Sequence, residues 1–433
     1  MSKELRPRYL EVWLQGQHAG WLCEAGRVTR FVASEAYLTN RGRLTLSASM
    51  TAPGIEAVTQ SILGNHFNPA IYRERGELPP FFAGLMPEGA LRKRLAATRK
   101  DERDMDDFGI LAAAGEDLPG AVVVVPANLD KLTQSARAFG VTGGADNLES
   151  YVPEAAAEGA ASLSGVQDKL ALSNARNGQR FCMPVKGTLS DLIAKLPLSH
   201  DDSQVMNEYV CMHLAQLAGV EVAHCRPERM EAMEDHPDLV EALGAQTRFL
   251  AVDRFDRTPA GPVHMEDACQ MLTLMPAQKY AGRSQFVTFI ALLNRLSVKG
   301  ITDVRQMFIR QAVNTLLGNS DAHLKNFSVL YRDGINPALS PAYDIVCVSA
   351  LPGFRGFATN VAIDKMQRAE TLDTYSEVAK LADVPHGIAT AAVRQTVARA
   401  KELWPKALQD MDMPDPVRVE ILDRLKTLPL AAQ

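Results

Sequence analysis

The chain has 433 residues, which is enough for two or three domains with full-sized hydrophobic cores. With 46% hydrophobic and 22% charged residues, its composition excludes intrinsically disordered and collagen-like proteins. The 46 Lys and Arg residues against 51 Asp and Glu residues give a net charge of −5, so the chain lacks the overall positive field that drives unaided binding to nucleic acid.

The first 137 residues predict a β-rich subdomain. Apolar and polar residues alternate in Tyr9–Leu14 and again in Val28–Val32, which is the pattern of strands with one buried face. The spacing of apolar residues becomes helical between Phe81 and Leu95. The β-branched run Ala121–Val125 is short enough for one buried strand near the end of the subdomain.

Residues 138–257 predict a small sheet interrupted by one helix. The stretch 138–161 is rich in Gly, Asn, Glu and Ala and indicates a connector. A strongly periodic helix is predicted over 204–218. Short strands are predicted at Lys169–Leu172, Arg180–Met183, Leu192–Leu196, Glu221–His224 and Arg248–Val252. We interpret this region as a nucleotide-binding lobe.

Residues 258–433 predict an all-α lobe, so the chain as a whole is expected to have a two-lobed α+β fold behind its N-terminal subdomain. From Met265 onward the spacing of apolar residues is almost wholly helical. Helices are predicted at Gln285–Leu296, Asp303–Leu317, Thr374–Leu381 and Ala389–Leu403. Two short extended pieces interrupt them, at Phe327–Tyr331 and Ala342–Val346.

The six cysteines are scattered and include no Cys-x-x-Cys pair, which fits neither a disulfide framework nor a zinc site. The amino terminus has no signal-peptide core, and no apolar run is long enough to span a membrane. We therefore expect a cytoplasmic protein with reduced thiols and no membrane partner.

The segment GNSDAHLKNF (318–327), followed by LSPAYD (339–344), carries the strongest chemical pattern. Phosphoryl transfer needs a carboxylate to orient the incoming hydroxyl, together with an amide oxygen and a second carboxylate to hold Mg²⁺. Asp321, Asn326 and Asp344 supply that set, and the Asp-to-Asn offset of five matches the protein-kinase catalytic loop. An isolated helix end followed by a polar turn would explain Asp321 and Asn326 alone. His323 could act in catalysis or be a solvated loop residue, with neither favoured.

Ser162–Lys169 (SLSGVQDK) follows the connector directly and precedes a predicted strand. Small residues allow backbone N–H groups to approach phosphate oxygens, and Lys169 could add a positive charge. The octapeptide is not a Walker motif, and a turn leading into the strand would also explain it. Its place at the start of the nucleotide lobe favours phosphate binding.

Lys195 lies on an apolar strand, where a lysine is either snorkelling to water or aimed at an anion. Glu208, near the start of the following helix, could pair with Lys195 as in the kinase Lys–Glu ion pair. Val252–Arg257 closes the β-rich half immediately before the helical half. This segment could be a hinge that contacts adenine or an ordinary solvated linker.

Taken in order, SLSGVQDKLAL, DLIAKLP, NEYVCMHLAQLAGV, DRFDR, GNSDAHLKNFS and LSPAYD resemble the HipA family, the kinase component of HipBA toxin–antitoxin modules. The resemblance spans essentially the whole chain. It implies a serine/threonine protein kinase fold related to the phosphoinositide kinases, with ATP and Mg²⁺ between the lobes. It assigns Asp321 as catalytic base, Asn326 and Asp344 as metal ligands and Lys195 as the phosphate-contacting lysine.

The resemblance also places adenine against Asp253, Arg254 and Phe255. Other nucleotide-binding residues then come from the phosphate loop, the Lys–Glu pair and the catalytic loop; these are Ser164, Gly165, Val166, Gln167, Lys169, Glu208 and Lys325. Family members phosphorylate a serine in their own phosphate loop and so inactivate themselves. The matching position here is Ser162, with Ser164 as an adjacent alternative.

The partners implied by the family are a HipB-like helix-turn-helix antitoxin dimer, operator DNA bound through that antitoxin, and a protein substrate. The substrate of full-length family toxins is an aminoacyl-tRNA synthetase, of the glutamyl type in the best-known case. Two other interpretations stay open from the sequence: a small-molecule or lipid kinase, and a catalytically silent scaffold that only binds the antitoxin.

Overall fold

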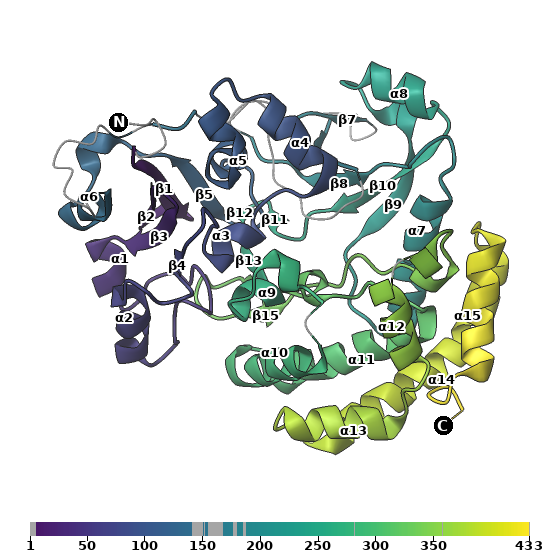
Figure 1. The fold of residues 1–433 in the computed structure, drawn as a ribbon. Helices are drawn as coiled ribbons and strands as arrows, with labels where there is room; N and C mark the ends of the chain where they lie inside the picture. The colour runs from purple at the N-terminus through teal and green to yellow at the C-terminus, as the bar shows by residue number, and fades with distance from the viewer. Residues whose placement is uncertain are drawn as a thin grey trace.

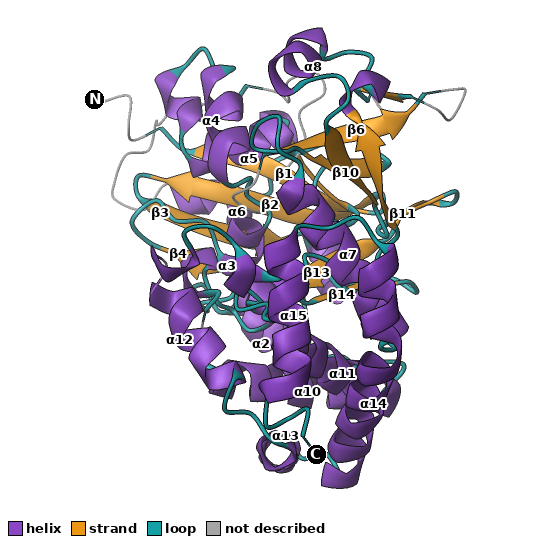
Figure 2. Cartoon of the chain, turned by 90° about the vertical axis from the view of Figure 1, so that its right-hand side faces the viewer, coloured by secondary structure: helices purple, strands orange, loops and turns teal. Residues whose placement is uncertain are grey.

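The structure is a computed structural model that describes residues 6–140, 150, 152–154, 168–175, 180–184, 188–280, 282–356 and 358–432. Two views at right angles place the strands mainly in the upper half of the molecule and the long helices below them (Figure 1 and Figure 2). The expected α+β fold is confirmed. Among the described residues, no helix combines the length and the apolar character that crossing a lipid bilayer requires.

The N-terminal sheet is antiparallel throughout, with the strand order β4-β3-β2-β1-β5. A two-residue turn joins its first two strands at Gln15 and Gly16, where both φ angles are positive, as such tight hairpins require. The strands are β1 (Arg8–Leu14), β2 (Gln17–Ala25), β3 (Val28–Ala33), β4 (Tyr72–Arg73) and β5 (Val122–Pro126). The predicted strands near residues 9, 28 and 121 are therefore confirmed.

Six helices complete the N-terminal subdomain: α1 (Glu35–Thr39), α2 (Glu56–Gly64), α3 (Pro80–Gly84), α4 (Gly89–Ala97), α5 (Asp107–Ala114) and α6 (Gln134–Gly140). The helical spacing between Phe81 and Leu95 corresponds to two helices, because Pro87 lies between α3 and α4 and cannot continue a helix. The core of this subdomain joins apolar residues of β1 to α3 and α5.

The second sheet has the order β7-β6-β8-β10-β9. Its strands are β6 (Lys169–Asn174), β7 (Phe181–Cys182), β8 (Leu192–Lys195), β9 (Cys225–Arg229) and β10 (Arg248–Asp253). The helix α7 (Ser203–Leu217) follows β8, as predicted, and α8 (Pro237–Leu243) follows β9. In the pairing of β6 with β8, Lys169 lies directly opposite Lys195.

One predicted strand of this region is misplaced. Glu221–His224 forms no strand; Val222 makes a single bridge to Ala342, and the strand begins at Cys225. The sequence of β9, CRPER, does not predict a strand. It contains a proline and three charged residues and lacks the alternation of apolar and polar residues that is typical of strands.

The C-terminal part consists of α9 (Ala268–Met271), α10 (Arg283–Leu296), α11 (Ile301–Leu317), α12 (Ala358–Gln367), α13 (Leu372–Leu381), α14 (His386–Asp410) and α15 (Asp415–Thr427). The four predicted helices correspond to α10, α11, α13 and α14. A short sheet of β13 (His264–Asp267), β14 (Ser328–Tyr331) and β15 (Ala338–Leu339) lies among them, so Met265 lies in a strand rather than at the start of a helical region. A small hairpin, β11 (Arg257–Thr258) and β12 (Gly261–Pro262), precedes β13.

The helix α11 directs the chain into the segment 318–327. Its buried residues, among them Val304, Phe308 and Leu316, recur at helical spacing and join α7, α10 and α14 in one core. The helix ends at Gly318 in a left-handed conformation, φ 72°, where a Cβ atom would lie 2.2 Å from Ser349 Oγ. Glycine is therefore required at this turn, which fixes where the polar loop begins.

Candidate active site

A cleft lies where the second sheet, the N-terminal subdomain and the C-terminal helices meet. Its inner part is a cavity of about 120 Å³ with apolar walls from Ile193, Met212, Val252 and Met265. Its outer part is a cavity of about 260 Å³ whose lining is mostly polar. Both cavities share a set of lining residues, so they are adjoining parts of one cleft: Lys169, Glu208, Lys325 and Asp344.

Four charged side chains, which we call the cleft cluster, lie at the junction of the two cavities: Lys169, Lys195, Glu208 and Asp344. Lys195 on β8 donates hydrogen bonds from Nζ to the carboxylates of both Glu208 on α7 and Asp344. The ion pair with Glu208 is the one that the order of the sequence suggested. Lys195 and Glu208 are buried, whereas the Asp344 side chain is 31% exposed and faces the cleft.

The charges of the cleft cluster fix its protonation. Burial disfavours the charged forms, but the two carboxylates outweigh it for Lys195 and raise the pKa of that ammonium group. Likewise, burial opposes ionisation of Asp344, yet the positive charges of Lys195 and Lys169 hold its pKa well below the usual value. Burial lowers the pKa of Lys169. Asp344 is therefore a carboxylate at neutral pH.

Asp344 has a left-handed backbone, with φ 59°, a conformation that few residues other than Gly, Asn and Asp adopt readily. The amide of Asn326 donates to Asp344 Oδ2 at 3.1 Å, and the amide of Asn319 donates to the Asp344 carbonyl at 3.4 Å. The residues predicted to hold Mg²⁺, Asn326 and Asp344, thus lie side by side although 18 positions separate them.

Asp321 and His323 line the outer cavity together with Asn326 and Asp344. Asp321 Oδ1 accepts a hydrogen bond from the hydroxyl of Tyr280 at 2.5 Å, and the Tyr280 ring meets the His323 ring edge-on at 5.2 Å. Burial and the nearby Lys279 charge lower the pKa of His323. An uncharged imidazole therefore lies beside Asp321 at neutral pH.

Lys325, which was predicted to contact nucleotide, lines both cavities, but its ammonium group is bonded to protein groups. Its Nζ donates to the Gly84 carbonyl at 3.1 Å and to Asp267 Oδ2 at 3.2 Å, with Glu88 at 3.9 Å. Only 3% of its side chain is exposed. Lys325 thus joins the catalytic loop to the N-terminal subdomain.

The predicted hinge residues, Asp253–Phe255, line the inner cavity, but the side chains of Asp253 and Arg254 bond other partners. The Asp253 carboxylate bonds His224 Nδ1 at 2.7 Å and Arg226 Nη1 at 2.8 Å. The Arg254 guanidinium joins a buried network described below. Phe255 stays at the cavity, with its ring 5.6 Å from that of Tyr343.

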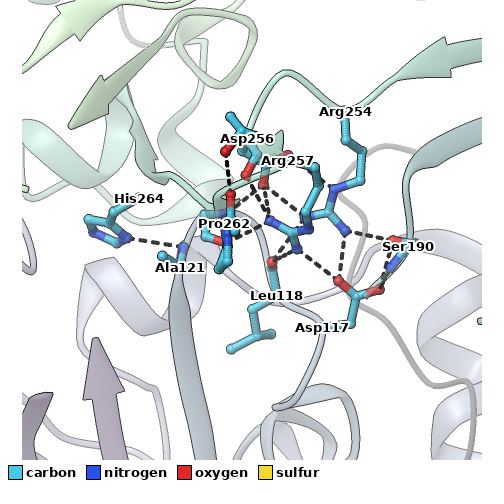
Figure 3. Close-up of polar contacts among 12 residues, drawn as sticks. Asp117, Leu118, Ala121, Ser190, Arg254, Asp256, Arg257, Pro262 and His264 are labelled. Atoms are coloured by element: carbon cyan, nitrogen blue, oxygen red, sulfur yellow. Dashed lines mark hydrogen bonds and ion pairs between the residues drawn. The ribbon is translucent and has the colours of Figure 1, made fainter. Parts of the chain in front are cut away.

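A second group of buried charges, which we call the hinge cluster, lies behind the inner cavity: Asp117, Ser190, Arg254, Asp256 and Arg257 (Figure 3). Arg254 Nη1 lies 2.8 Å from both Asp117 Oδ1 and Ser190 Oγ, and its Nε and Nη2 bond Asp256. Arg257 bonds the same two aspartates. Because Asp117 belongs to the N-terminal subdomain, this cluster fixes that subdomain to the hinge.

The predicted phosphate-loop residues Ser162, Ser164, Gly165, Val166 and Gln167 lie outside the residues that the structure describes. Several other side chains at the cleft were not predicted from the sequence: Glu88, Met212, Lys279 and Tyr280. Glu88 comes from the N-terminal subdomain, and no local pattern connects it with the cleft. The Lys279–Tyr280 pair follows Pro276 in a short turn without a motif, so only the fold identifies it.

Comparison with known proteins gives matches along nearly the whole chain. The family model described as HipA-like C-terminal domain matches residues 161–404, and that described as HipA N-terminal domain matches residues 10–125. The protein named "Putative kinase Y4dM" from Sinorhizobium fredii is 32% identical over 426 residues, which cover 96% of this chain and 95% of that protein.

Two further matches come from Shewanella oneidensis. Its protein named serine/threonine-protein kinase toxin HipA is 32% identical over 214 residues, or 45% of this chain and 44% of that protein. The solved complex of HipA, HipB and operator DNA contains a chain with a TM-score of 0.66 and 18% identity, matched over 98% of this chain and 96% of that chain. At that identity the solved structure speaks to the fold alone.

Proposed function

This chain belongs to the HipA family, and from that premise we propose that it is a toxin serine/threonine protein kinase that transfers the γ-phosphoryl group of ATP to a protein hydroxyl. The observation that carries the proposal is the meeting of Lys195, Glu208, Asn326 and Asp344 at one cleft that Asp321 also lines. Lys195 and Glu208 come from the consecutive elements β8 and α7, whereas Asp321, Asn326 and Asp344 lie more than 100 positions later in the other lobe.

The donor chemistry of the cleft fits an ATP–magnesium complex. Asp344 offers an ionised carboxylate and Asn326 an amide oxygen, and such hard oxygen ligands are those that Mg²⁺ prefers. When bound, Mg²⁺ supplies charge neutralisation for the phosphates. The inner cavity suits a planar base, because apolar side chains form its walls and the hinge residues Asp253–Phe255 line it.

Asp321 acts in this proposal as the base at the acceptor. The acceptor oxygen forms a bond to the γ-phosphorus as the bond from that phosphorus to the β–γ bridging oxygen breaks, and the electron pair leaves on ADP. The acceptor proton passes to the Asp321 carboxylate. Lys195, held by Glu208, orients the phosphates that remain on ADP.

Regulation and partners follow from family membership. We propose that the chain phosphorylates Ser162, or the adjacent Ser164, which adds about −1.5 to −2 charges to a loop that binds anions and so prevents nucleotide binding. We further propose a helix-turn-helix antitoxin as partner, operator DNA bound through it, and the glutamyl-tRNA synthetase as acceptor. Membership of the HipA family supports the first two partners, and the solved Shewanella complex, whose HipA shares this fold, holds HipB and operator DNA.

Asp321→Gln is the direct test, with labelled ATP and purified glutamyl-tRNA synthetase. The wild type should label itself and the synthetase, and mass spectrometry should locate phosphate on residues 162–164. The variant should lose labelling by about 10³-fold or more while binding ATP nearly as well, because the amide cannot accept the proton. If labelling persists in the variant, Asp321 is not the base; if the wild type labels no protein, the protein-kinase proposal fails.

A further inference from the structure

The lysine that the sequence places in the catalytic loop is committed elsewhere. Lys325 is bonded to the Gly84 carbonyl and Asp267, with only 3% of its side chain exposed. Moving it toward a phosphate would leave Asp267 and the carbonyl buried without their partner, which is unfavourable. Beside Lys169 and Lys195 of the cleft cluster, a further cation at the outer cavity would therefore help to balance the charge that develops on the transferred group.

Lys279 is such a cation. Its side chain lines the outer cavity with Asp321, Asn326 and Asp344, and 17% of it is exposed. Its described carboxylate neighbour is Glu88, whose Oε2 lies 3.7 Å from Nζ, a distance longer than a hydrogen bond. Lys279 Nζ also lies over the Tyr280 ring, 5.5 Å from its centroid, so Lys279 shares a cavity with Asp321 and is held less tightly than Lys325.

The segment that carries Lys279 is fixed to the catalytic loop at three points. The Lys279 carbonyl accepts a hydrogen bond from the Leu324 N–H at 3.1 Å. The next residue, Tyr280, donates to Asp321 and meets the His323 ring. The backbone of Lys279 therefore has a set position relative to Asp321, which limits where its ammonium group can lie.

We propose that Lys279 is a further catalytic residue, whose ammonium group contacts the phosphoryl group while it passes from ATP to the acceptor. This inference rests on the proposed kinase function and deepens it. Lys195 and Lys279 then divide the phosphates between them. Lys195, bonded to two carboxylates in the cleft cluster, faces the part that stays on ADP, and Lys279 faces the part that leaves.

The test is Lys279→Met, which keeps the length of the side chain and removes its charge. Binding of ADP with Mg²⁺ is measured by calorimetry with and without aluminium fluoride, which mimics the phosphoryl group in transfer. Aluminium fluoride should tighten ADP binding to the wild type, and that gain should fall about tenfold or more in the variant while affinity for ADP alone changes little. Phosphate transfer should slow by about 10²-fold.

Lys401→Met is the control, because Lys401 is an exposed residue of α14 outside both cavities. It should match the wild type in every measurement, and Lys279→Arg should recover part of both losses. If Lys279→Met unfolds, Lys279→Gln replaces it. A variant that keeps the full gain from aluminium fluoride overturns the inference, even when the wild type labels protein as proposed. A wild type that binds ADP but labels no acceptor overturns the proposed function instead.

Discussion

The two buried charge clusters contain the same charges and differ in how those charges are satisfied. Each has two cations and two carboxylates. In the hinge cluster, the two guanidinium groups bond both aspartates, and the four side chains are only 3–9% exposed (Figure 3). In the cleft cluster, Asp344 is 31% exposed and faces an adjoining cavity. A cluster that is buried throughout can stabilise the fold. A cluster with one exposed carboxylate can also exchange a protein partner for a ligand.

The type of cation explains part of this difference. A guanidinium has five donors in a fixed plane and can saturate two carboxylates at once, whereas an ammonium group is a compact charge that can change partners. Arginine in the hinge cluster and lysine in the cleft cluster thus match a fixed and an exchangeable role. The following substitutions test this division of roles.

Of these substitutions, Asp344→Asn should have the largest effect, and this effect should be on the rate of phosphate transfer. Asparagine keeps the size of the side chain and tolerates the left-handed backbone, but it removes the ionised ligand. Transfer should fall by about 10³-fold, equivalent to about 4 kcal/mol, with little change in the free energy of unfolding. Labelling rates and urea unfolding measure the two quantities.

Asp383→Asn is a matched control, because Asp383 is exposed and also has a positive φ, 56°. It should change neither quantity. If Asp344→Asn destabilises the protein strongly and leaves transfer intact, the cleft cluster is structural and the contrast between the clusters disappears.

Arg254→Met should act on stability instead. It leaves Asp117 and Asp256 buried with Arg257 alone, so the free energy of unfolding should fall by about 3 kcal/mol. The control Arg226→Met removes an arginine that is 30% exposed and pairs with Asp253 on the surface, where about 0–1 kcal/mol is expected. Unchanged stability with slower transfer in Arg254→Met would show that the hinge cluster serves catalysis directly.

Glu266 sharpens the contrast, because it is a buried carboxyl held by hydroxyl and N–H donors rather than by a cation. It accepts from Ser47 Oγ, the Ala48 N–H and the Tyr331 hydroxyl. Burial raises its pKa to about 7. The folded protein therefore binds an extra proton between pH 4.5 and 7, and stability should decline by on the order of 3 kcal/mol as pH rises through this range.

Glu266→Gln should remove that decline in stability. Urea unfolding of the wild type and of the variant is measured between pH 4.5 and 8, and the difference between their free energies of unfolding gives the contribution of Glu266. His264, whose pKa burial lowers to about 4, makes stability rise with pH over part of the same range. Its contribution is common to both proteins and cancels. Equal slopes in the two proteins would mean that Glu266 is ionised throughout.

The sequence was informative where chemistry is encoded locally. Asp321, His323 and Asn326 belong to one loop, and a glycine that the backbone requires fixes the start of that loop. The long helices were predictable for a similar reason, because each buries one face at regular spacing. The pairing of Lys195 with Glu208 could be suggested because β8 and α7 are consecutive elements.

What the sequence did not reveal depends on contacts between distant segments. Lys325 was grouped with nucleotide-binding residues and lines both cavities, but its bond to Gly84, 241 positions away, was not foreseen. Arg254 was grouped with them too and lines the inner cavity, but the bond of its side chain to Asp117, 137 positions away, was not foreseen. Lys279 and Tyr280 acquire significance only when the turn that carries them lies beside Asp321. No pattern within a short window encodes such neighbours.

The bond between Asp117 and Arg257 also has a consequence for synthesis of the protein. These residues are 140 positions apart, so at about 5–20 residues per second the aspartate leaves the ribosome roughly ten seconds before its arginine. Asp321 and Asp344 emerge later still. The N-terminal half of each new molecule is thus synthesised well before the residues proposed to bind nucleotide. During this interval a binding partner could contact the growing chain before the chain is able to transfer phosphate.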